Sequence, residues 1–276
     1  MIPKIIHYCW FGNSEIPEKD KKCIESWKKY CPEYKIVRWD ETNYNVNKNK
    51  YMKEAYEAKK WGFVPDVARL DIVYEHGGIY LDTDVELVRN LDDLLENAAF
   101  MGFESDTAVS PGLGFGAEKH SLIIGEILRS IYSMRTFLRE DGSYDMRPSP
   151  SRNTQFLVTK GLQLNGEFQI LSCGLTIYPK EYFCPLDYET GILSLTDNTY
   201  SIHHFHASWC TKEEMKAHEL AQKIAKKYGK PLALVISQIY IFPYILKVKL
   251  EKYGFFGTIQ FCIKRIIRLG SINKIK

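Results

Sequence analysis

Two aspartates, Asp82 and Asp84, follow the short apolar run Ile79-Tyr80-Leu81 and frame Thr83. In an extended segment successive side chains alternate between two faces, so the two carboxylates point the same way. Neighbouring carboxylates repel each other unless a cation lies between them, and Mg²⁺ and Mn²⁺ prefer oxygen ligands. The pair therefore predicts a divalent metal site that a diphosphate completes. The alternative is a solvated turn at the end of a strand.

Asp66 and Arg69 lie three residues apart at the start of a predicted helix. One interpretation is a helix N-cap with a local ion pair. The other places Asp66 on ribose hydroxyls and Arg69 on a sugar or phosphate, because a guanidinium group suits oxygen-rich ligands. The sequence leaves both interpretations open.

Three histidines, His203, His204 and His206, come within four residues and precede Ser208 and Trp209. In a strand, His204 and His206 would share a face, a spacing that permits a common ligand. A neutral imidazole can bind Mn²⁺, and the Ser208 hydroxyl and the Trp209 indole N–H can donate to a phosphate. The alternative is a half-buried strand with histidines at its solvent edge.

The elements that must position these residues alternate between strand and helix through the first 85 residues. The apolar pattern predicts strands at 2–10, 34–39 and 79–81, and helices at 17–30, 51–61 and 65–76. Such alternation is typical of a mostly parallel sheet, in which ligands bind at the carboxyl ends of the strands. Trp10 and the two aspartates lie at such ends.

Two later stretches are interpreted as loops. Residues 105–116 are rich in glycine, and residues 141–153 carry Pro, Ser and Arg without periodicity. Each is either a mobile loop that meets the acceptor or a simple connection.

The charge is distributed unevenly along the chain. The net charge is +3, too small to predict a nucleic-acid partner. The segment from Lys247 to the end contains eight basic residues and one acidic residue, so this tail carries +7 and the first 246 residues carry −4. Before the tail come a charged helix at 211–228 and the apolar stretch Leu232–Leu246, whose 15 residues are short for a membrane span of about 20. We therefore predict a helix in the interface of an anionic membrane; the alternative is ordinary core packing.

The cysteines and the N-terminus indicate the compartment. The seven cysteines are scattered without a CxxC spacing, and no basic-then-apolar signal peptide precedes the first predicted strand. We expect a protein of the reducing cytoplasm, peripheral on the inner face of the cytoplasmic membrane.

Three segments in this order resemble one family. Residues 2–12, 64–84 and 203–209 are similar to the opening, core and late motifs of the glycosyltransferases with the DXD sugar-binding region, glycosyltransferase family 32. That family includes bacterial capsular-polysaccharide transferases and yeast initiating mannosyltransferases. The segments around 110–116 and 151–155 match it only loosely.

The resemblance implies a fold and an activity. The fold is the α/β GT-A type, a single Rossmann-like, mostly parallel mixed sheet flanked by helices. It would form a catalytic domain at 1–212, followed by a helical C-terminal extension at 213–276. The activity is a metal-dependent, retaining transfer of a hexose from a UDP-sugar, the nucleotide-sugar donor, to a saccharide acceptor that is lipid-linked. Bacterial capsular or surface polysaccharide synthesis is the implied setting.

The resemblance also implies the site residues. Those implied to bind the donor are Trp10 (stacked on the base), Asp66, Arg69, Tyr80, Asp82, Ser208 and Trp209. The metal, Mn²⁺ or Mg²⁺, is assigned to Asp84, Asp82 and His204. Asp82, Asp84 and Arg69 are the residues implied to assist departure of the nucleoside diphosphate.

Two other functions use some of the same residues. In a haloacid-dehalogenase-type phosphatase an apolar strand also ends in Asp-x-Asp, and the first aspartate is the nucleophile. A non-catalytic carbohydrate-binding protein needs aromatic platforms but no paired carboxylates. Metal-dependent hydrolysis of a nucleotide-sugar separates the three, because only the transferase performs it.

Overall fold

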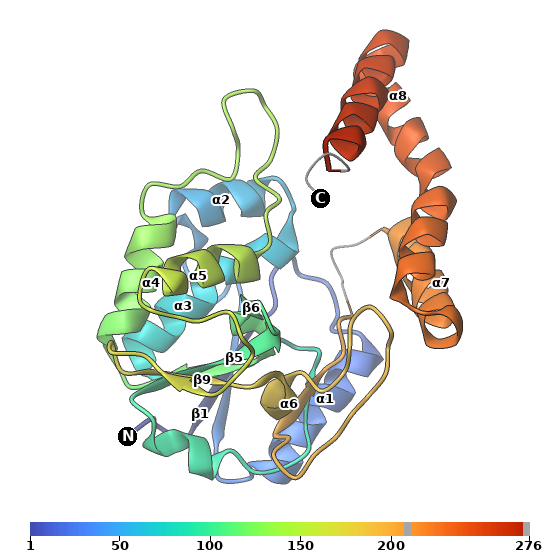
Figure 1. Cartoon of the computed structure of the whole chain (residues 1–276). Helices are drawn as coiled ribbons and strands as arrows, with labels where there is room; N and C mark the ends of the chain where they lie inside the picture. Colours follow the sequence, from blue (N-terminus) through green and yellow to red (C-terminus); the bar gives the residue numbers. More distant parts are fainter. Residues whose placement is uncertain (207–210, 273–276) are drawn as a thin grey trace. The chain divides into compact units, whose positions relative to one another are not determined.

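A computed structural model describes residues 1–206 and 211–272 (Figure 1). The chain divides into two compact units. The first, the sheet unit, comprises Met1–Asp187 and Leu193–Trp209. The second, the helical unit, comprises Tyr188–Ile192 and Cys210–Lys276.

The sheet unit is a mixed α/β structure. Its strands are β1 (Ile5–Cys9), β2 (Lys35–Trp39), β3 (Gly78–Tyr80), β4 (Val85–Leu87), β5 (Ala99–Ser105), β6 (Ala108–Val109), β7 (Phe115–Ala117), β8 (Gln169–Ile170), β9 (Leu175–Tyr178) and β10 (Ser201–His203). Its α-helices are α1 (Glu18–Tyr30), α2 (Lys50–Glu57), α3 (Pro65–His76), α4 (Leu122–Tyr132), α5 (Ser149–Val158) and α6 (Lys180–Phe183). The strands and helices predicted in the first 81 residues all form, with bounds shifted by a few residues.

The main sheet has the strand order β2-β1-β3-β7-β5-β9-β8, with β6 paired to β5. The pairs β1–β2, β1–β3 and β5–β9 are parallel, whereas β7 runs antiparallel to both β3 and β5. Strands β1, β2, β3, β5 and β9 therefore point the same way. The prediction of an α/β fold with a mostly parallel mixed sheet is confirmed.

The segment predicted as a loop at 105–116 contributes to this sheet. Strand β7 lies between β3 and β5, with Tyr80 opposite Phe115 and Phe100 opposite Gly116. The prediction was wrong here because the strand is short and rich in glycine. A side chain at Gly116 would collide with the Phe100 ring, 2.5 Å from the added Cβ. Glycine therefore marks close packing at this position, as it often does within strands.

Helices cover both faces of the sheet (Figure 1). Side chains of α2, α3 and α4 pack on one face, with Met101 and Phe115 from the strands. Side chains of α1 and α6 pack on the other, with Ile79 and Phe100. Phe100 and Met101 are neighbours in β5 and enter opposite cores, as the period of two in a strand requires.

The segment predicted as a loop at 141–153 also contains a helix. Helix α5 begins at Ser149, directly after Pro148, and has Pro150 in its first turn. Proline is tolerated at the start of a helix because the N–H groups there have no intrahelical partner. Arg152 and Asn153 consequently lie on the buried side of a helix.

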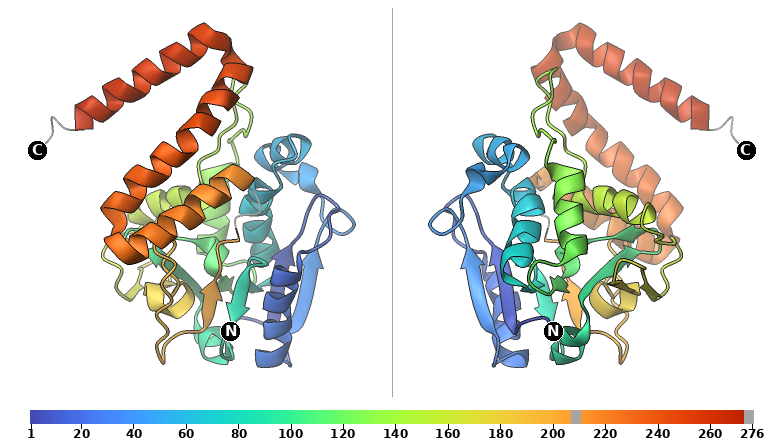
Figure 2. Two further views of the ribbon diagram at one scale, coloured as in Figure 1. Left: turned by 90° about the vertical axis from the view of Figure 1, so that its right-hand side faces the viewer. Right: turned by 90° about the vertical axis from the view of Figure 1, so that its left-hand side faces the viewer.

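The helical unit contains α7 (Lys212–Tyr228) and α8 (Lys230–Ile272), which pack against each other. A capping box between Thr211 and Glu214 begins α7. Helix α8 continues through Pro243 and bends at Gly254, whose φ of 66° lies outside the helical region (Figure 2). Within the described residues, Lys230–Glu251 is one helix that is long and apolar enough to cross a membrane, judged by length and composition.

Candidate active site

The two aspartates lie in the turn between β3 and β4. Asp82, Asp84 and His203 each bring a ligand atom to within 4.8 Å of the others, and this is the candidate cation site among the described residues. His203 Nε2 lies 3.3 Å from Asp84 Oδ1. The side chains are partly buried, with 27% of Asp82, 15% of Asp84 and 12% of His203 exposed. The turn thus gathers two carboxylates and an imidazole at the carboxyl end of β3.

Helix α1 and strand β10 hold this turn in place. The indole of Trp27, fully buried, donates to the carbonyl of Val85 at 2.7 Å, and Leu87 N donates to Ser26 Oγ at 2.8 Å. Strand β10 pairs antiparallel with β4, with His203 opposite Val85. This pairing brings His203 to the aspartates across more than one hundred residues of sequence.

The histidine that lies with the two aspartates is His203. The prediction of His204 as the metal ligand is therefore wrong in this structure. Strand β10 ends at His203, and the following side chain points elsewhere: His204 Nε2 lies 2.8 Å from Glu86 Oε2. His206 contacts Asp20 on α1, and its backbone N–H donates to Asp84 Oδ2 at 2.9 Å. The rings of His204 and His206 stack, with centres 5.5 Å apart, so these two side chains do lie together as the sequence predicted. It is the assignment of His204 to the metal, implied by the family resemblance, that differs from the structure.

The electrostatics of the cluster fit a divalent cation. Burial raises the pKa of Asp82. Burial acts the same way on Asp84, but attraction to His203 and hydrogen bonds from His203 and His206 outweigh it and hold the pKa of Asp84 below its ordinary value. His203 Nδ1 is buried without a hydrogen-bond partner among the described residues. Two carboxylates and an imidazole are a donor set that Mn²⁺ and Mg²⁺ accept, so the residues present suit either ion.

Metal affinity should depend on pH through His203. Burial is the largest single influence and lowers the pKa of this imidazole, but attraction to Asp84 and Asp82 and the hydrogen bond with Asp84 together outweigh it, so the net pKa lies above 6.5. A cation that is coordinated by His203 must displace the proton of the imidazolium. Mn²⁺ affinity should therefore rise about tenfold per pH unit up to that pKa and then level off. Calorimetric Mn²⁺ titrations between pH 6 and 9 measure this slope. His203→Gln should flatten it, and a wild-type affinity independent of pH would exclude His203 from the site.

Arg69 links the aspartates to helix α3. Its Nη1 lies 3.4 Å from Asp82 Oδ2, its Nη2 lies 3.3 Å from Asp66 Oδ1, and its Nε donates to Pro65 O at 2.9 Å. The guanidinium also lies over the Tyr80 ring, 5.2 Å from its centre. Burial is the largest influence on Asp66 and raises its pKa to about 6, although Arg69 and Arg152 oppose it. The predicted local ion pair is therefore present, but Asp66 is not the helix N-cap, because Val64 occupies that position and no side chain caps the helix. Arg69 also lies beside Asp82, as a role in donor binding requires.

Gly112 is a site residue that the sequence did not single out. A Cβ added at Gly112 would lie 2.5 Å from Asp82 Oδ2 and 3.1 Å from Arg69 Nη1. Its carbonyl accepts a long hydrogen bond from Asp82 N, at 3.4 Å. The Pro111-Gly112-Leu113-Gly114 sequence was the available signal, because glycine often marks close approach of the backbone to a site.

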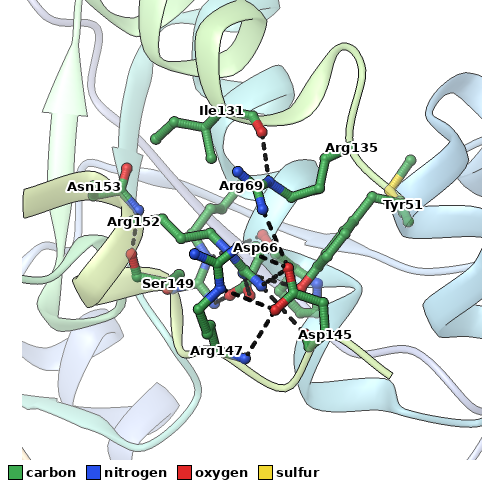
Figure 3. A network of polar contacts seen from close by, with 12 residues as sticks. Tyr51, Asp66, Arg69, Ile131, Arg135, Asp145, Arg147, Ser149, Arg152 and Asn153 are labelled. Atoms are coloured by element: carbon green, nitrogen blue, oxygen red, sulfur yellow. Dashed lines mark hydrogen bonds and ion pairs between the residues drawn. The ribbon is translucent and has the colours of Figure 1, made fainter. Parts of the chain in front are cut away.

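A network of arginines around Asp145 was also missed (Figure 3). Arg152 connects it to the site: its Nη1 lies 3.7 Å from Asp66 Oδ2 and its Nη2 lies 3.3 Å from Asp145 Oδ2. The Tyr51 hydroxyl receives a further hydrogen bond from Arg152 at 3.0 Å. Nothing in the local sequence pattern marks these residues, because they come from α2, α3, α5 and the segment before α5.

The remaining predicted residues lie as follows. Trp10 directly follows β1, its backbone N–H donates to Trp39 O, and its indole donates to Ser14 O at 2.7 Å. Tyr80 is buried in β3, beneath Arg69. Ser208 and Trp209 lie outside the described residues. Their assignment to a phosphate stays a prediction.

The fold and the site together define a class: an α/β domain with paired carboxylates at the end of a central strand and an arginine beside them. Residues 17–101 match the family described as "Glycosyltransferase sugar-binding region containing DXD motif". Over these residues the resemblance predicted from the sequence is confirmed, and the chain carries this DXD region of the glycosyltransferases.

Curated relatives carry the same region. Inositol phosphoceramide mannosyltransferase 3 of Schizosaccharomyces pombe is 34% identical over 142 residues, which are 47% of this chain and 37% of that protein. Mannosyl phosphorylinositol ceramide synthase SUR1 of Saccharomyces cerevisiae is 31% identical over 128 residues, 45% of this chain and 33% of that protein. An uncharacterized glycosyltransferase, L373, of Acanthamoeba polyphaga mimivirus is 38% identical over 101 residues, 34% of this chain and 40% of that protein. The chain thus spans about two fifths or less of the length of these relatives.

Among solved structures, a chain named PaToxG glycosyltransferase aligns with a TM-score of 0.43 at 19% identity. The alignment covers 57% of this chain and 68% of that chain.

Proposed function

We propose that this protein is a metal-dependent glycosyltransferase that takes a nucleotide-sugar as donor. One observation carries the proposal: Asp82, Asp84 and His203 form a compact candidate cation site, and Arg69 lies 3.4 Å from Asp82. The phosphatase alternative uses the first aspartate as a free nucleophile. Here that aspartate, Asp82, is engaged by Arg69 and lies against Gly112, an arrangement that favours binding over attack.

The chain's own residues have distinct parts in this reaction. When bound, the cation acts as a Lewis acid on the diphosphate that leaves the sugar. Arg69 supplies a fixed positive charge beside Asp82, where negative charge develops on the leaving group. Asp66 keeps Arg69 oriented from the other side, at 3.3 Å. We propose retention at the sugar carbon, which the family resemblance supports.

For the donor we propose a hexose carried by a nucleoside diphosphate, with UDP-sugars as the first class to examine. The names of the fungal relatives specify mannose, which is a hexose. A thermal-shift panel of UDP- and GDP-sugars with Mn²⁺ tests this. A ligand at one hundred times its Kd should add about 2.7 kcal/mol to the apparent stability. A panel in which no nucleotide-sugar raises Tm in the presence of Mn²⁺ or Mg²⁺ would contradict the proposal.

For the acceptor we propose a lipid-linked saccharide, of the kind used in bacterial capsular or surface polysaccharide synthesis. Helix α8 supports the lipid part. Its first segment, Lys230–Glu251, is only 6% buried within its most apolar window. Exposed apolar side chains there include Leu234, Ile239 and Tyr240, which at about 100° per residue lie on different sides of the helix. The expected interfacial helix would be apolar on one face only, so the segment is also suited to insertion.

A liposome experiment tests the membrane proposal. Full-length protein should float with anionic vesicles at low salt, because the apolar surface of α8 and the basic residues after it both favour binding. The double variant Leu234→Gln/Ile239→Gln should remain largely at the bottom of the gradient. These side chains are 55% and 67% exposed, so the change should leave the fold intact.

Two further measurements complete that experiment. Resistance to extraction by alkaline carbonate would indicate insertion, and release by carbonate would indicate peripheral binding. Equal flotation of the wild type and the double variant would exclude α8 as the membrane contact without affecting the transferase proposal.

A further inference from the structure

The segment between α4 and α5 forms a short hairpin with a fixed base. Leu138 bridges to Tyr144, and Asp145 N donates to Phe137 O at 2.7 Å. Glu54 on α2 accepts hydrogen bonds from the backbone N–H groups of Phe137 and Leu138, at 2.8 and 3.0 Å. The base of the hairpin is therefore fixed to α2 through hydrogen bonds from its backbone N–H groups.

Asp145 lies at the base of this hairpin and gathers four arginines. Its carboxylate lies 3.2 Å from Arg135 Nη1, 3.1 Å from Arg139 Nη2, 3.1 Å from two nitrogens of Arg147, and 3.3 Å from Arg152 Nη2. These residues are here called the Asp145 cluster. Two carboxylate oxygens offer about four acceptor positions, so Asp145 is saturated. Further N–H donors of the arginines remain for other ligands.

The cluster holds more positive charge than its aspartates neutralise. The ion pairs described for Arg135, Arg139 and Arg147 all end on Asp145, whereas Arg152 also reaches Asp66. Four arginines against Asp145 and Asp66, the latter shared with Arg69, leave an excess of at least two positive charges. Glu140 and Asp141 lie exposed at the hairpin tip, where Asp141 is occupied with Ser143 of its own turn.

The cluster passes from the interior to the surface. Arg152 and Asp145 are 3% and 5% exposed, whereas Arg139 and Arg147 are 48% and 51% exposed. An open hollow of about 370 Å³ adjoins it, lined by Arg135, Arg139 and Asp145 together with Ser130, Thr136 and Met134. The hydroxyls can add hydrogen bonds, and Met134, 94% exposed, offers an apolar surface beside the charge. This combination suits an anionic group attached to a larger molecule.

We propose that the Asp145 cluster binds a phosphate group carried by the sugar acceptor. A phosphate has one or two negative charges and several acceptor oxygens, which match the excess charge and the planar forks of the arginines. A continuous series of contacts, Asp82–Arg69–Asp66–Arg152–Asp145, connects the cluster to the candidate active site. The acceptor phosphate would therefore lie on the side of Arg69 away from Asp82. This inference rests on the proposed transferase function.

The test uses the full-length chain without divalent cations, in EDTA, so that the aspartate site does not contribute. Two probes are titrated calorimetrically: inorganic phosphate and the soluble phosphodiester glycerophosphoinositol. The wild type should bind the phosphodiester saturably. The variant Arg139→Gln/Arg147→Gln should bind it at least about tenfold more weakly, because two charge-assisted contacts are removed.

A matched control separates a specific site from general charge. Arg38→Gln/Arg89→Gln removes the same charge from two arginines of the sheet unit that are 43% and 39% exposed, each paired with one aspartate. This control should bind both probes as the wild type does. An equal loss in the two variants, or no saturable binding by the wild type, overturns the proposal.

The two probes distinguish the source of the phosphate. Tighter binding of the phosphodiester supports an acceptor headgroup, whereas tighter binding of inorganic phosphate overturns the acceptor assignment. Nucleotide-sugar binding with Mn²⁺ is measured on the same wild-type sample. A protein that binds the phosphodiester but no nucleotide-sugar would contradict the transferase proposal while leaving the anion site standing.

Discussion

Replacing Asp84 by asparagine should reduce sugar transfer and metal-dependent donor hydrolysis by at least about 10³-fold, because the change removes a charged ligand from the cation site. The structure gives Asp84 the central place in that site. It lies 3.3 Å from His203 Nε2, and its carboxylate also accepts the N–H of His206. Its depressed pKa shows that the surroundings favour the ionised form, which is the form that binds a cation. Release of nucleoside diphosphate from donor in Mn²⁺ measures the loss.

The control for this variant is Asp197→Asn. Asp197 is exposed on a loop of the sheet unit, and among the described contacts none joins its side chain to Asp82, Asp84 or His203, so its replacement removes the same charge without changing the cation site. It should retain wild-type activity. Circular dichroism should show a folded Asp84→Asn protein, because asparagine can still accept the hydrogen bond from His206. An Asp84→Asn enzyme that kept most of its activity would refute the assignment of the DXD motif.

Replacing Gly112 by alanine should cost about 10²-fold in activity with little loss of stability. The added Cβ would lie 2.5 Å from Asp82 Oδ2 and 3.1 Å from Arg69 Nη1, so the carboxylate or the guanidinium must move. Displacements of about 1 Å in groups that position reactants cost rate on that scale. Gly112 has no positive φ, so alanine introduces no backbone strain. Steady-state rates and thermal unfolding of the variant test both parts.

Gly161→Ala is the matched comparison. At Gly112 an added Cβ meets close atoms without backbone strain, whereas at Gly161 it meets no atom but the backbone is strained. Gly161 has a φ of 96°, and no atom lies within 4 Å of the added Cβ. Its replacement should therefore lower stability by roughly 1 kcal/mol through backbone strain and leave activity unchanged. If Gly112→Ala were as active as the wild type, Asp82 would have room to adjust, and its close contact with Gly112 would have no role in catalysis.

Elements whose signals are local in the sequence could be predicted, whereas elements that depend on contacts distant in the sequence could not. Helix α3 could be predicted to the residue because its signals are local: Pro65 at the first position and Gly77, with a φ of 66°, at the end. Strand β7 could not be predicted, because it is defined by its hydrogen-bonded pairing with β3 and β5, which exists only in the folded sheet. The prolines at the start of helix α5 predict a loop, although proline is also tolerated in the first turn of a helix, as it is here.

The same division holds for the site. The sequence by itself determined the resemblance to the DXD glycosyltransferases, the alternating α/β architecture and the aspartates of the candidate cation site, because these depend on motif order and on side-chain periodicity. Only the tertiary structure decided which histidine joins Asp82 and Asp84, since the pairing of β10 with β4 brings His203 there, whereas His204 contacts Glu86 and His206 contacts Asp20. It also decided that Gly112 limits the space around Asp82 and that Arg152 joins Asp66 to Asp145. Contacts between residues so distant in the chain leave no periodic trace in the sequence, because the packing of separate elements creates them.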